Sequence, residues 1–220
     1  MFDFNEKIYK YSAEALESVR DEFNSIDRIT EFNQQKMLKA FIENNVSESM
    51  FSGTTGYGYS DRGRETIDKV FARAVGAEDS LVRHNFTCGT HTLAVALFGV
   101  LRPGDTMLCV TGTPYDTIHP VIGLNGQDGS GSLKDFKISY KQVELKADGT
   151  LDFEAIENAI DSSIAMVYIQ RSRGYSLRPS LSVDEIGKVA EIAKRKSNAV
   201  VMVDNCYGEW VEEKEPTQVG

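Results

Sequence analysis

Apolar residues recur every three or four positions in the N-terminal part of the chain. One stripe runs through residues 6–24 and a second through residues 29–42. This spacing puts the apolar side chains on one face of a helix and predicts two amphipathic helices. We expect these helices to form an N-terminal arm over residues 1–50 that packs against the core or contacts another subunit.

The helical pattern is interrupted at residues 52–63, where four glycines and two tyrosines predict an irregular loop. Helical spacing returns at Glu65 and stops at Gly76. A glycine just past the last turn is a common helix end, so a helix is predicted between these two residues.

Short apolar runs then alternate with helical stretches. The predicted strands are residues 81–84, 106–110, 137–145, 165–170 and 199–204. The predicted helices are residues 90–101, 152–160 and 183–196, and a polar surface loop is expected at 125–135. This alternation predicts an α/β fold with a mostly parallel sheet and covering helices.

Three of the apolar runs stop at clusters of polar or glycine residues. The clusters are Cys88-Gly89-Thr90-His91 after the first run, Tyr115 after the second and Asp204 after the last. Right-handed crossovers bring the ends of parallel strands to one edge, and open α/β sheets bind ligands there. We therefore expect these loops to meet in one pocket.

Composition narrows the class of protein. The 220 residues suffice for one sizeable domain, and 41% hydrophobic with 26% charged residues is typical of soluble chains. A net charge of -9 disfavours binding to nucleic acid or anionic membranes. The N-terminus lacks a signal-peptide pattern and no apolar stretch is long enough to span a bilayer, which predicts a cytoplasmic protein.

The cysteines Cys88, Cys109 and Cys206 are odd in number and widely spaced, which disfavours a disulfide framework. A zinc site formed by Cys88, His91 and Cys206 would lack a second closely spaced ligand pair, so no metal site is predicted. The ordinary interpretation of the three cysteines is buried thiols.

The Gly89-Thr90 helix start and the Asp204 carboxylate suggest complementary chemistry. Unpaired N–H groups at a helix start attract anions such as phosphate, although an ordinary capped helix start would look the same. A carboxylate at the end of an apolar strand needs a cation or hydrogen-bond donors. A protonated pyridine nitrogen would serve, and an N-cap or a structural salt bridge is the alternative.

Three further side chains follow predicted strands. Tyr115 suits stacking on a planar ring and proton transfer, or is simply a turn tyrosine on the surface. Arg171 and Arg173 suit binding of a phosphate, a carboxylate or a cofactor oxygen, or are simply solvated.

The order and spacing of these groups resemble the pyridoxal 5'-phosphate enzymes of the aspartate aminotransferase fold, fold type I. The segments YGYSDRGRE, QRSRGYS and VDNCYGEWVEEKEP are similar to the methionine gamma-lyase-like group described as cystathionine beta-lyase family proteins involved in aluminium resistance. The resemblance covers about residues 50–220. It implies that residues 51–220 are the N-terminal part of a three-layer cofactor-binding large domain.

The resemblance also implies residue roles. Gly89, Thr90 and His91 would hold the cofactor phosphate, Tyr115 would stack on the ring, and Asp204 would pair with the ring nitrogen. Tyr59 would reach the phosphate of a neighbouring subunit, which implies a homodimer or homotetramer with shared sites.

Two positions depart from the better-known lyases. Asp61 occupies the position of a phosphate-binding arginine, so the adjacent Arg62 becomes the candidate second ligand. Gly174 stands near the position of an asparagine in those enzymes, which leaves Arg171 or Arg173 as candidate replacements.

The Schiff-base lysine of the family is expected some tens of residues beyond Asp204. Lys214 is the only lysine after Asp204, and its acidic surroundings indicate a solvated surface charge. We therefore expect the chain to be the N-terminal portion of a longer enzyme, without that lysine.

The implied activity is that of a carbon-sulfur lyase that eliminates a thiol from a sulfur amino acid, at the beta or gamma position. Tyr115 would be the catalytic proton donor. An aminotransferase, decarboxylase or racemase of the same fold is an alternative, and a catalytically silent binding or oligomerisation module is another. A Rossmann-type oxidoreductase is disfavoured because the glycine fingerprint is absent.

Overall fold

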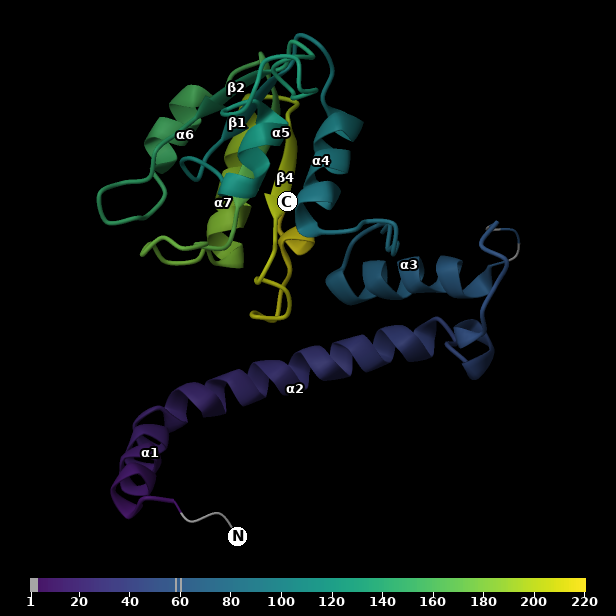
Figure 1. The fold of residues 1–220 in the computed structure, drawn as a ribbon, viewed down its shortest axis with the longest axis vertical. Helices are drawn as coiled ribbons and strands as arrows, with labels where there is room; N and C mark the ends of the chain where they lie inside the picture. Colours follow the sequence, from purple (N-terminus) through teal and green to yellow (C-terminus); the bar gives the residue numbers. More distant parts are fainter. Residues whose placement is uncertain (1–3, 58, 60) are drawn as a thin grey trace.

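A helical arm and an α/β unit make up the protein in the computed structural model, which describes residues 4–57, 59 and 61–220 (Figure 1). The helices are α1 (Glu6–Ser18), α2 (Arg20–Glu43), α3 (Arg62–Val75), α4 (Gly89–Val100), α5 (His119–Ile122), α6 (Phe153–Ala159) and α7 (Val183–Lys196). The strands are β1 (Thr106–Cys109), β2 (Ser139–Gln142), β3 (Ile164–Gln170) and β4 (Val200–Asp204).

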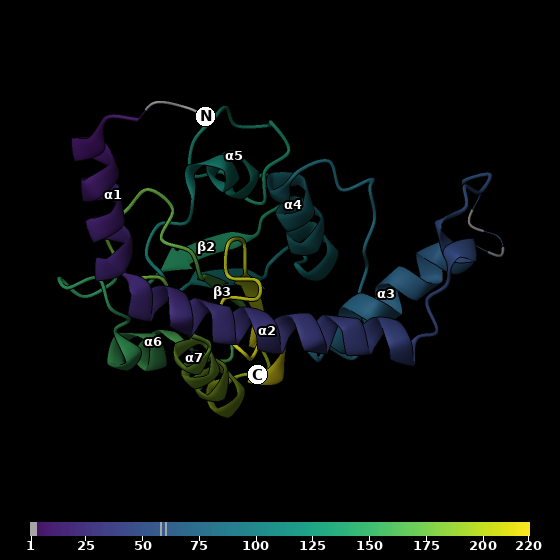
Figure 2. The ribbon, with the colours of Figure 1, turned by 90° about the horizontal axis from the view of Figure 1, so that it is seen from below.

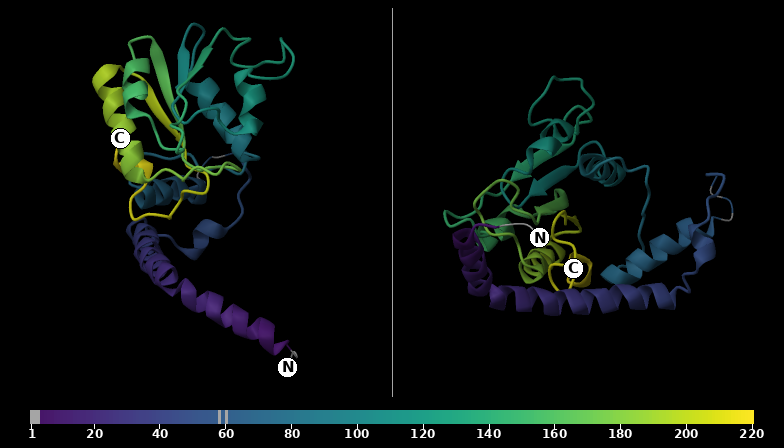
Figure 3. Two further views of the ribbon diagram at one scale, coloured as in Figure 1. Left: turned by 90° about the vertical axis from the view of Figure 1, so that its left-hand side faces the viewer. Right: turned by 60° about the horizontal axis from the view of Figure 1, so that its bottom comes forward.

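The four strands form one parallel sheet in the order β2-β1-β3-β4. Side chains alternate between its two faces: Met107 and Cys109 of β1 belong to the cluster that includes α4 and α5, whereas Leu108 packs with α6 and α7. Figure 3 shows the strands between these two helical layers. The predicted three-layer α/β architecture with a parallel sheet is confirmed.

The arm is formed by α1 and α2, which are separated at Val19. No residue of α1 is buried. Helix α2 runs along the underside of the molecule and packs on α3, where Ala40, Val70 and Ala74 form a small apolar cluster (Figure 2). Two helices are therefore present, but the break between them lies at Val19, whereas the predicted break at residues 25–28 falls inside α2. The proposed division at residue 50 stays a prediction.

The predicted strand at residues 81–84 is wrong. These residues form no strand and are held by α3 instead, since Asp68 accepts hydrogen bonds from the backbone N–H of Val82 at 2.8 Å and from the Arg83 guanidinium at 2.7 and 2.8 Å. A side chain thus takes the backbone donor that a neighbouring strand would need for pairing.

The other predicted elements are confirmed, with ends that shift by a few residues. The strand predicted at 137–145 is the most shortened, since only Ser139–Gln142 pair with β1. Gly76 ends α3 in a left-handed conformation, with φ of 70°, as expected of a helix-ending glycine. Within the described residues, no helix combines the length and apolar character needed to cross a membrane.

Candidate active site

A cavity of about 1050 Å³ opens where β3 and β4 end and α4 begins. Its lining includes Gly89, Thr90, Tyr115, Arg173 and Asp204. The clusters that follow the apolar runs therefore meet in one pocket, as predicted, although the run before Gly89 forms no strand. The cavity is at the upper end of the usual size of small-molecule sites.

The start of α4 forms one wall. Gly89 is exposed, and no atom lies within 4 Å of the position that a side chain would occupy, so the backbone is open to a ligand. The Thr90 hydroxyl donates to the Thr117 hydroxyl at 2.9 Å, and the Cys88 sulfur caps the helix by accepting from the His91 N–H. The free N–H groups of this first turn suit an anion.

His91 does not line the cavity. Its Nδ1 lies 3.2 Å from the backbone nitrogen of Thr87 and accepts its N–H, and its ring packs edge-on against Phe86. Of the predicted phosphate-binding group, the structure brings Gly89 and Thr90 into the cavity and places the His91 side chain outside it.

Asp204, at the end of β4, lines the same cavity. Its Oδ1 accepts from the Cys206 N–H at 3.1 Å and its Oδ2 accepts from the Tyr168 hydroxyl at 3.4 Å. Neither donor is a cation, and Asp204 takes part in no ion pair found among the described residues. Asp204 therefore has no cationic partner among the described residues, and its position suits a cationic group in the cavity.

Tyr168 is a site residue that the sequence interpretation missed. It is fully buried in β3, and burial, followed by the nearby charge of Asp204, raises its pKa, so the phenol stays protonated and donates. The available signal was one hydroxyl-bearing side chain in a strand that is otherwise apolar up to its last residue, Gln170.

Tyr115 lies at the cavity rim, where its backbone N–H donates to Gln170 Oε1 at 2.6 Å. Its ring packs near the ring of Tyr175, with centroids 5.9 Å apart. Gly174 has φ of 57°, and a side chain there would come within 3.3 Å of the Tyr115 ring. The hydrogen bond with Tyr175 is the main reason that the pKa of Tyr115 rises to about 12.

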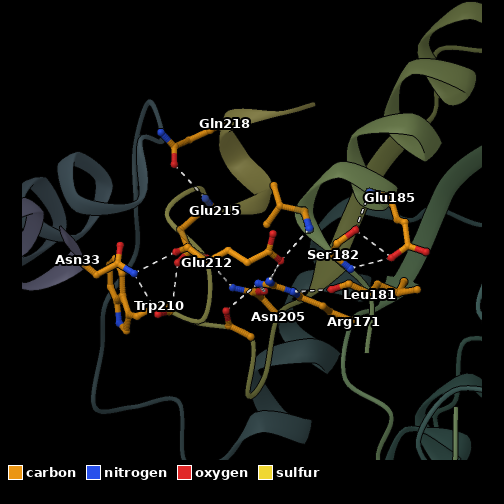
Figure 4. A network of polar contacts seen from close by, with 12 residues as sticks. Asn33, Arg171, Leu181, Ser182, Glu185, Asn205, Trp210, Glu212, Glu215 and Gln218 are labelled. Atoms are coloured by element: carbon orange, nitrogen blue, oxygen red, sulfur yellow. Dashed lines mark hydrogen bonds and ion pairs between the residues drawn. The ribbon is translucent and has the colours of Figure 1, made fainter. Parts of the chain in front are cut away.

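The two predicted arginines separate. Arg173 is exposed and lines the cavity. Arg171 is buried and does not, because its guanidinium is bonded to Leu181, Asn205, Gly208 and Glu212 (Figure 4). Of the two candidates, only Arg173 is in a position to reach a ligand of this cavity.

Tyr59 and Arg62 also lie outside the cavity lining. Tyr59 is 89% exposed, Arg62 begins α3, and the adjoining motif residues Gly58 and Ser60 lie outside the described residues. Asp61, the departure from the better-known lyases, caps α3 by accepting from the Arg64 N–H and the Thr54 hydroxyl. These bonds, chiefly that from Arg64, lower its pKa.

Two of the three cysteines are not buried, which corrects the prediction. Cys88 and Cys206 are exposed and line the cavity, because one caps α4 and the other follows β4, whereas Cys109 is buried in β1. Partial desolvation of the thiol, followed by the charge of Asp204, raises the pKa of Cys206. The described residues contain no group of three or more His, Cys, Asp or Glu arranged to hold a metal.

No lysine belongs to the lining of the cavity in the described part of the chain. Lys214 is exposed in the segment after β4, in agreement with its interpretation as a surface charge. The cavity therefore offers an anion-binding helix start, an aromatic ring and a carboxylate, together with the exposed Arg173.

The comparisons with known proteins agree with this arrangement. The chain is 42% identical over its whole length to the uncharacterized protein YnbB of Bacillus subtilis (strain 168), of which it covers 53%. A carbon-sulfur lyase involved in aluminum resistance from Clostridium novyi NT aligns with 98% of the chain at 46% identity, with a TM-score of 0.93 and 52% of that chain covered. The chain thus spans about half the length of these relatives.

A more distant relative carries a defined activity in its name. The L-methionine gamma-lyase of Pseudomonas putida is 26% identical over 155 residues, which is 69% of this chain and 34% of that enzyme. The family model described as methionine gamma-lyase matches residues 8–220. The resemblance noted from the three sequence segments is confirmed by this match, and the chain belongs to the methionine gamma-lyase family.

Proposed function

We propose that this chain forms the cofactor-binding half of a pyridoxal phosphate-dependent carbon-sulfur lyase that acts on a sulfur amino acid in the cytoplasm. The observation that carries the proposal is one cavity lined by both the start of α4 and Asp204. Because the chain spans about half of its relatives, the activity is proposed for the whole protein.

The donor groups of the cavity fit this cofactor. The first-turn N–H groups at Gly89 and Thr90 suit its phosphate, the Tyr115 ring suits its planar face, and Asp204 suits its ring nitrogen. When bound, pyridoxal phosphate supplies an electron-withdrawing ring that stabilises negative charge on the substrate. Arg173 is exposed at the same cavity and is a further candidate for an anionic group.

The residues of this chain would orient the ligand and supply a proton. The Tyr168 hydroxyl donates to Asp204 Oδ2, so this carboxylate oxygen has a fixed donor in a residue that lines the cavity. A pKa of about 12 keeps the Tyr115 phenol protonated at neutral pH. Its Oη would then donate a proton to the leaving thiolate.

Cofactor binding by this chain is tested by titrating the purified protein with pyridoxal phosphate and recording circular dichroism in the cofactor's visible band. Free cofactor gives no such signal, so a saturable signal is expected on binding. The signal should weaken in Asp204→Ala and persist in Lys214→Ala, because Lys214 lies outside the cavity. A protein that gives no signal at any concentration would contradict the proposal.

The reaction is tested on the full-length protein with cystathionine, cysteine and methionine. A keto acid and a thiol are the expected products. Transamination, decarboxylation or racemisation products without a thiol would instead support another activity of the same fold. Cofactor binding without turnover of any of these amino acids would support a binding module.

We further propose that the whole protein is a homodimer or homotetramer. Support comes from Tyr59 and the arm, since Tyr59 is 89% exposed and α1 buries no residue in the single chain. Tyr59 and Arg62 would then act at the site of the neighbouring subunit. Light scattering on the full-length protein measures the subunit number, and a monomer at all concentrations would refute this part of the proposal.

A further inference from the structure

Arg171 was one of two candidate cofactor ligands, together with Arg173, yet its side chain is 3% exposed and does not line the cavity. It follows β3 directly, and its backbone N–H donates to the Asp204 carbonyl at 3.0 Å. This bond extends the pairing of β3 and β4 by one residue. It is made at Asp204, the residue whose carboxylate is proposed to meet the cofactor.

The guanidinium binds the segment that follows Asp204. Its Nη1 donates to Asn205 Oδ1 at 2.8 Å and to the Gly208 carbonyl at 2.7 Å. Its Nη2 pairs with Glu212 Oε1 at 2.6 Å (Figure 4). One planar side chain therefore holds three points of the segment 205–212 at once.

The same side chain is itself anchored to the α/β unit. Its Nε donates to the Leu181 carbonyl at 3.1 Å, and Glu212 Oε1 also accepts from the Val183 N–H at the start of α7. Gly208 packs directly on it, since a side chain there would come within 2.5 Å of the Arg171 Cδ. The segment is thus clamped against the ends of β3 and α7.

The other side of this segment lines the cavity. Four of its residues line the cavity next to Asp204: Asn205, Cys206, Tyr207 and Glu209. The Gly208 carbonyl instead accepts from Arg171. The Cys206 N–H, which binds Asp204 Oδ1, belongs to the same segment. Movement of the segment would therefore move a donor of the Asp204 carboxylate.

We propose that Arg171 is a positioning residue, which fixes the direction of the Asp204 carboxylate by clamping the segment 205–212 from outside the cavity. This inference rests on the proposed function, because Asp204 is the group proposed to meet the cofactor ring nitrogen. Arg171 touches no ligand in this arrangement and acts only through Asp204 and its neighbours.

The test replaces the planar guanidinium of Arg171 but keeps a positive charge at that position. Arg171→Lys keeps one cation but loses the planar set of donors, and Glu212→Gln, which keeps the acceptor oxygen, is a milder second variant. The matched control is Arg195→Lys, since Arg195 makes an exposed ion pair with Glu157. Residues that orient a ligand-binding group typically change affinity by about 10- to 100-fold when replaced.

Affinity for pyridoxal phosphate is measured by its induced circular dichroism. We expect Arg171→Lys to weaken binding by about tenfold and Arg195→Lys to leave it unchanged. In an Asp204→Asn background, Arg171→Lys should cause little further loss of affinity, because the carboxylate through which Arg171 acts is already absent. Equal losses in both backgrounds would show a merely structural role and would overturn the proposal.

A second measurement does not depend on the cofactor. Amide hydrogen exchange of the segment 205–212 should become about tenfold faster in Arg171→Lys or Glu212→Gln, while exchange in α4 stays unchanged. Unchanged exchange in the segment would overturn the proposal. If Arg171→Lys does not fold, the exchange of Glu212→Gln alone decides in the same way. If the wild-type protein gives no cofactor signal, the proposed function fails, and the exchange result alone decides whether Arg171 holds the segment.

Discussion

Two tyrosines outside the expected set govern the polar groups of the cavity. Tyr168 donates to the Asp204 carboxylate from a buried position, and Tyr175, whose ring centre lies 5.9 Å from that of Tyr115, raises the pKa of Tyr115. The functional properties of Asp204 and Tyr115 therefore depend on neighbours that lie 36 and 60 positions away in the chain.

The influence of Tyr175 predicts a pKa change at Tyr115. Hydrogen bonding to Tyr175 favours the protonated phenol, so Tyr175→Phe should lower the Tyr115 pKa from about 12 toward its ordinary value of about 10. The shift is read from the Cζ chemical shift of Tyr115 during a pH titration of ¹³C-tyrosine-labelled protein. A Tyr115 pKa that does not move would show that Tyr175 is not its cause.

A matched control for this titration is Tyr9→Phe. Tyr9 lies on α1 at 70% exposure, outside the cavity lining, so its loss should leave the Tyr115 pKa unchanged.

At the level of single elements, local sequence explains where several helices begin. Asp61, Asp152 and Ser182 each accept a hydrogen bond from the first turn of the helix that follows. Ser182 also forms a reciprocal pair with Glu185, in which the glutamate accepts from the serine N–H and hydroxyl. This capping box fixes the start of α7, next to the Glu212 contact.

Removal of the Ser182 cap should destabilise the protein measurably. Ser182→Ala leaves the Glu185 N–H without its side-chain acceptor and is expected to lower the free energy of unfolding by about 1 kcal/mol. Ser182→Thr keeps the hydroxyl and should retain most of the stability. Urea unfolding of the three proteins measures the difference, and equal midpoints for all three would contradict the role of the cap.

The strand predicted at residues 81–84 shows what an apolar run does not determine. A strand needs a neighbour that accepts its backbone bonds, and here Asp68 of α3 binds the Val82 N–H and the Arg83 side chain. The segment becomes an extended connection between α3 and α4. The apolar run alone does not distinguish a strand from an extended connection.

At the scale of the whole molecule, α2 of the arm contacts the segment 205–212, part of which lines the cavity. Asn33 is buried, and its Nδ2 donates to the carbonyls of Trp210 and Glu212 at 3.0 Å each. Lys36 donates to the Glu213 carbonyl and lies 5.3 Å from the centre of the Trp210 ring. The segment 205–212 is therefore held by two groups, the Arg171 guanidinium and helix α2.

This contact predicts that Asn33 couples the arm to the α/β unit. Asn33→Ala leaves two carbonyls without their donor and is expected to lower the free energy of unfolding by about 1–3 kcal/mol. The arm should also become more sensitive to limited proteolysis. Gln35→Ala is the control, because Gln35 is exposed and bonds only to Glu31 of the same helix.

An unchanged proteolysis pattern in Asn33→Ala would argue against this coupling. The Asn33 Oδ1 is buried without a partner in the structure, a cost that the substitution removes. The loss is therefore expected toward the lower end of that range.

Periodicity, helix-ending residues and the clusters after apolar runs were enough to predict the helices other than the short α5, four of the strands, the parallel sheet and a pocket shared by Gly89, Tyr115 and Asp204. These features are set by spacing along the chain, because a helix or strand must bury one face or both wherever it lies. The sequence segments were also enough to predict the family.

Only the tertiary structure decided the strand order, the loss of the strand at 81–84 and the separation of Arg171 from Arg173. Each of these depends on which distant group satisfies a backbone or side-chain bond, as Asp68 does for Val82 and as Glu212 does for Arg171. Two arginines two positions apart look alike in sequence. One faces a ligand cavity and the other holds its wall because burial and partners differ, and these are properties of the folded chain.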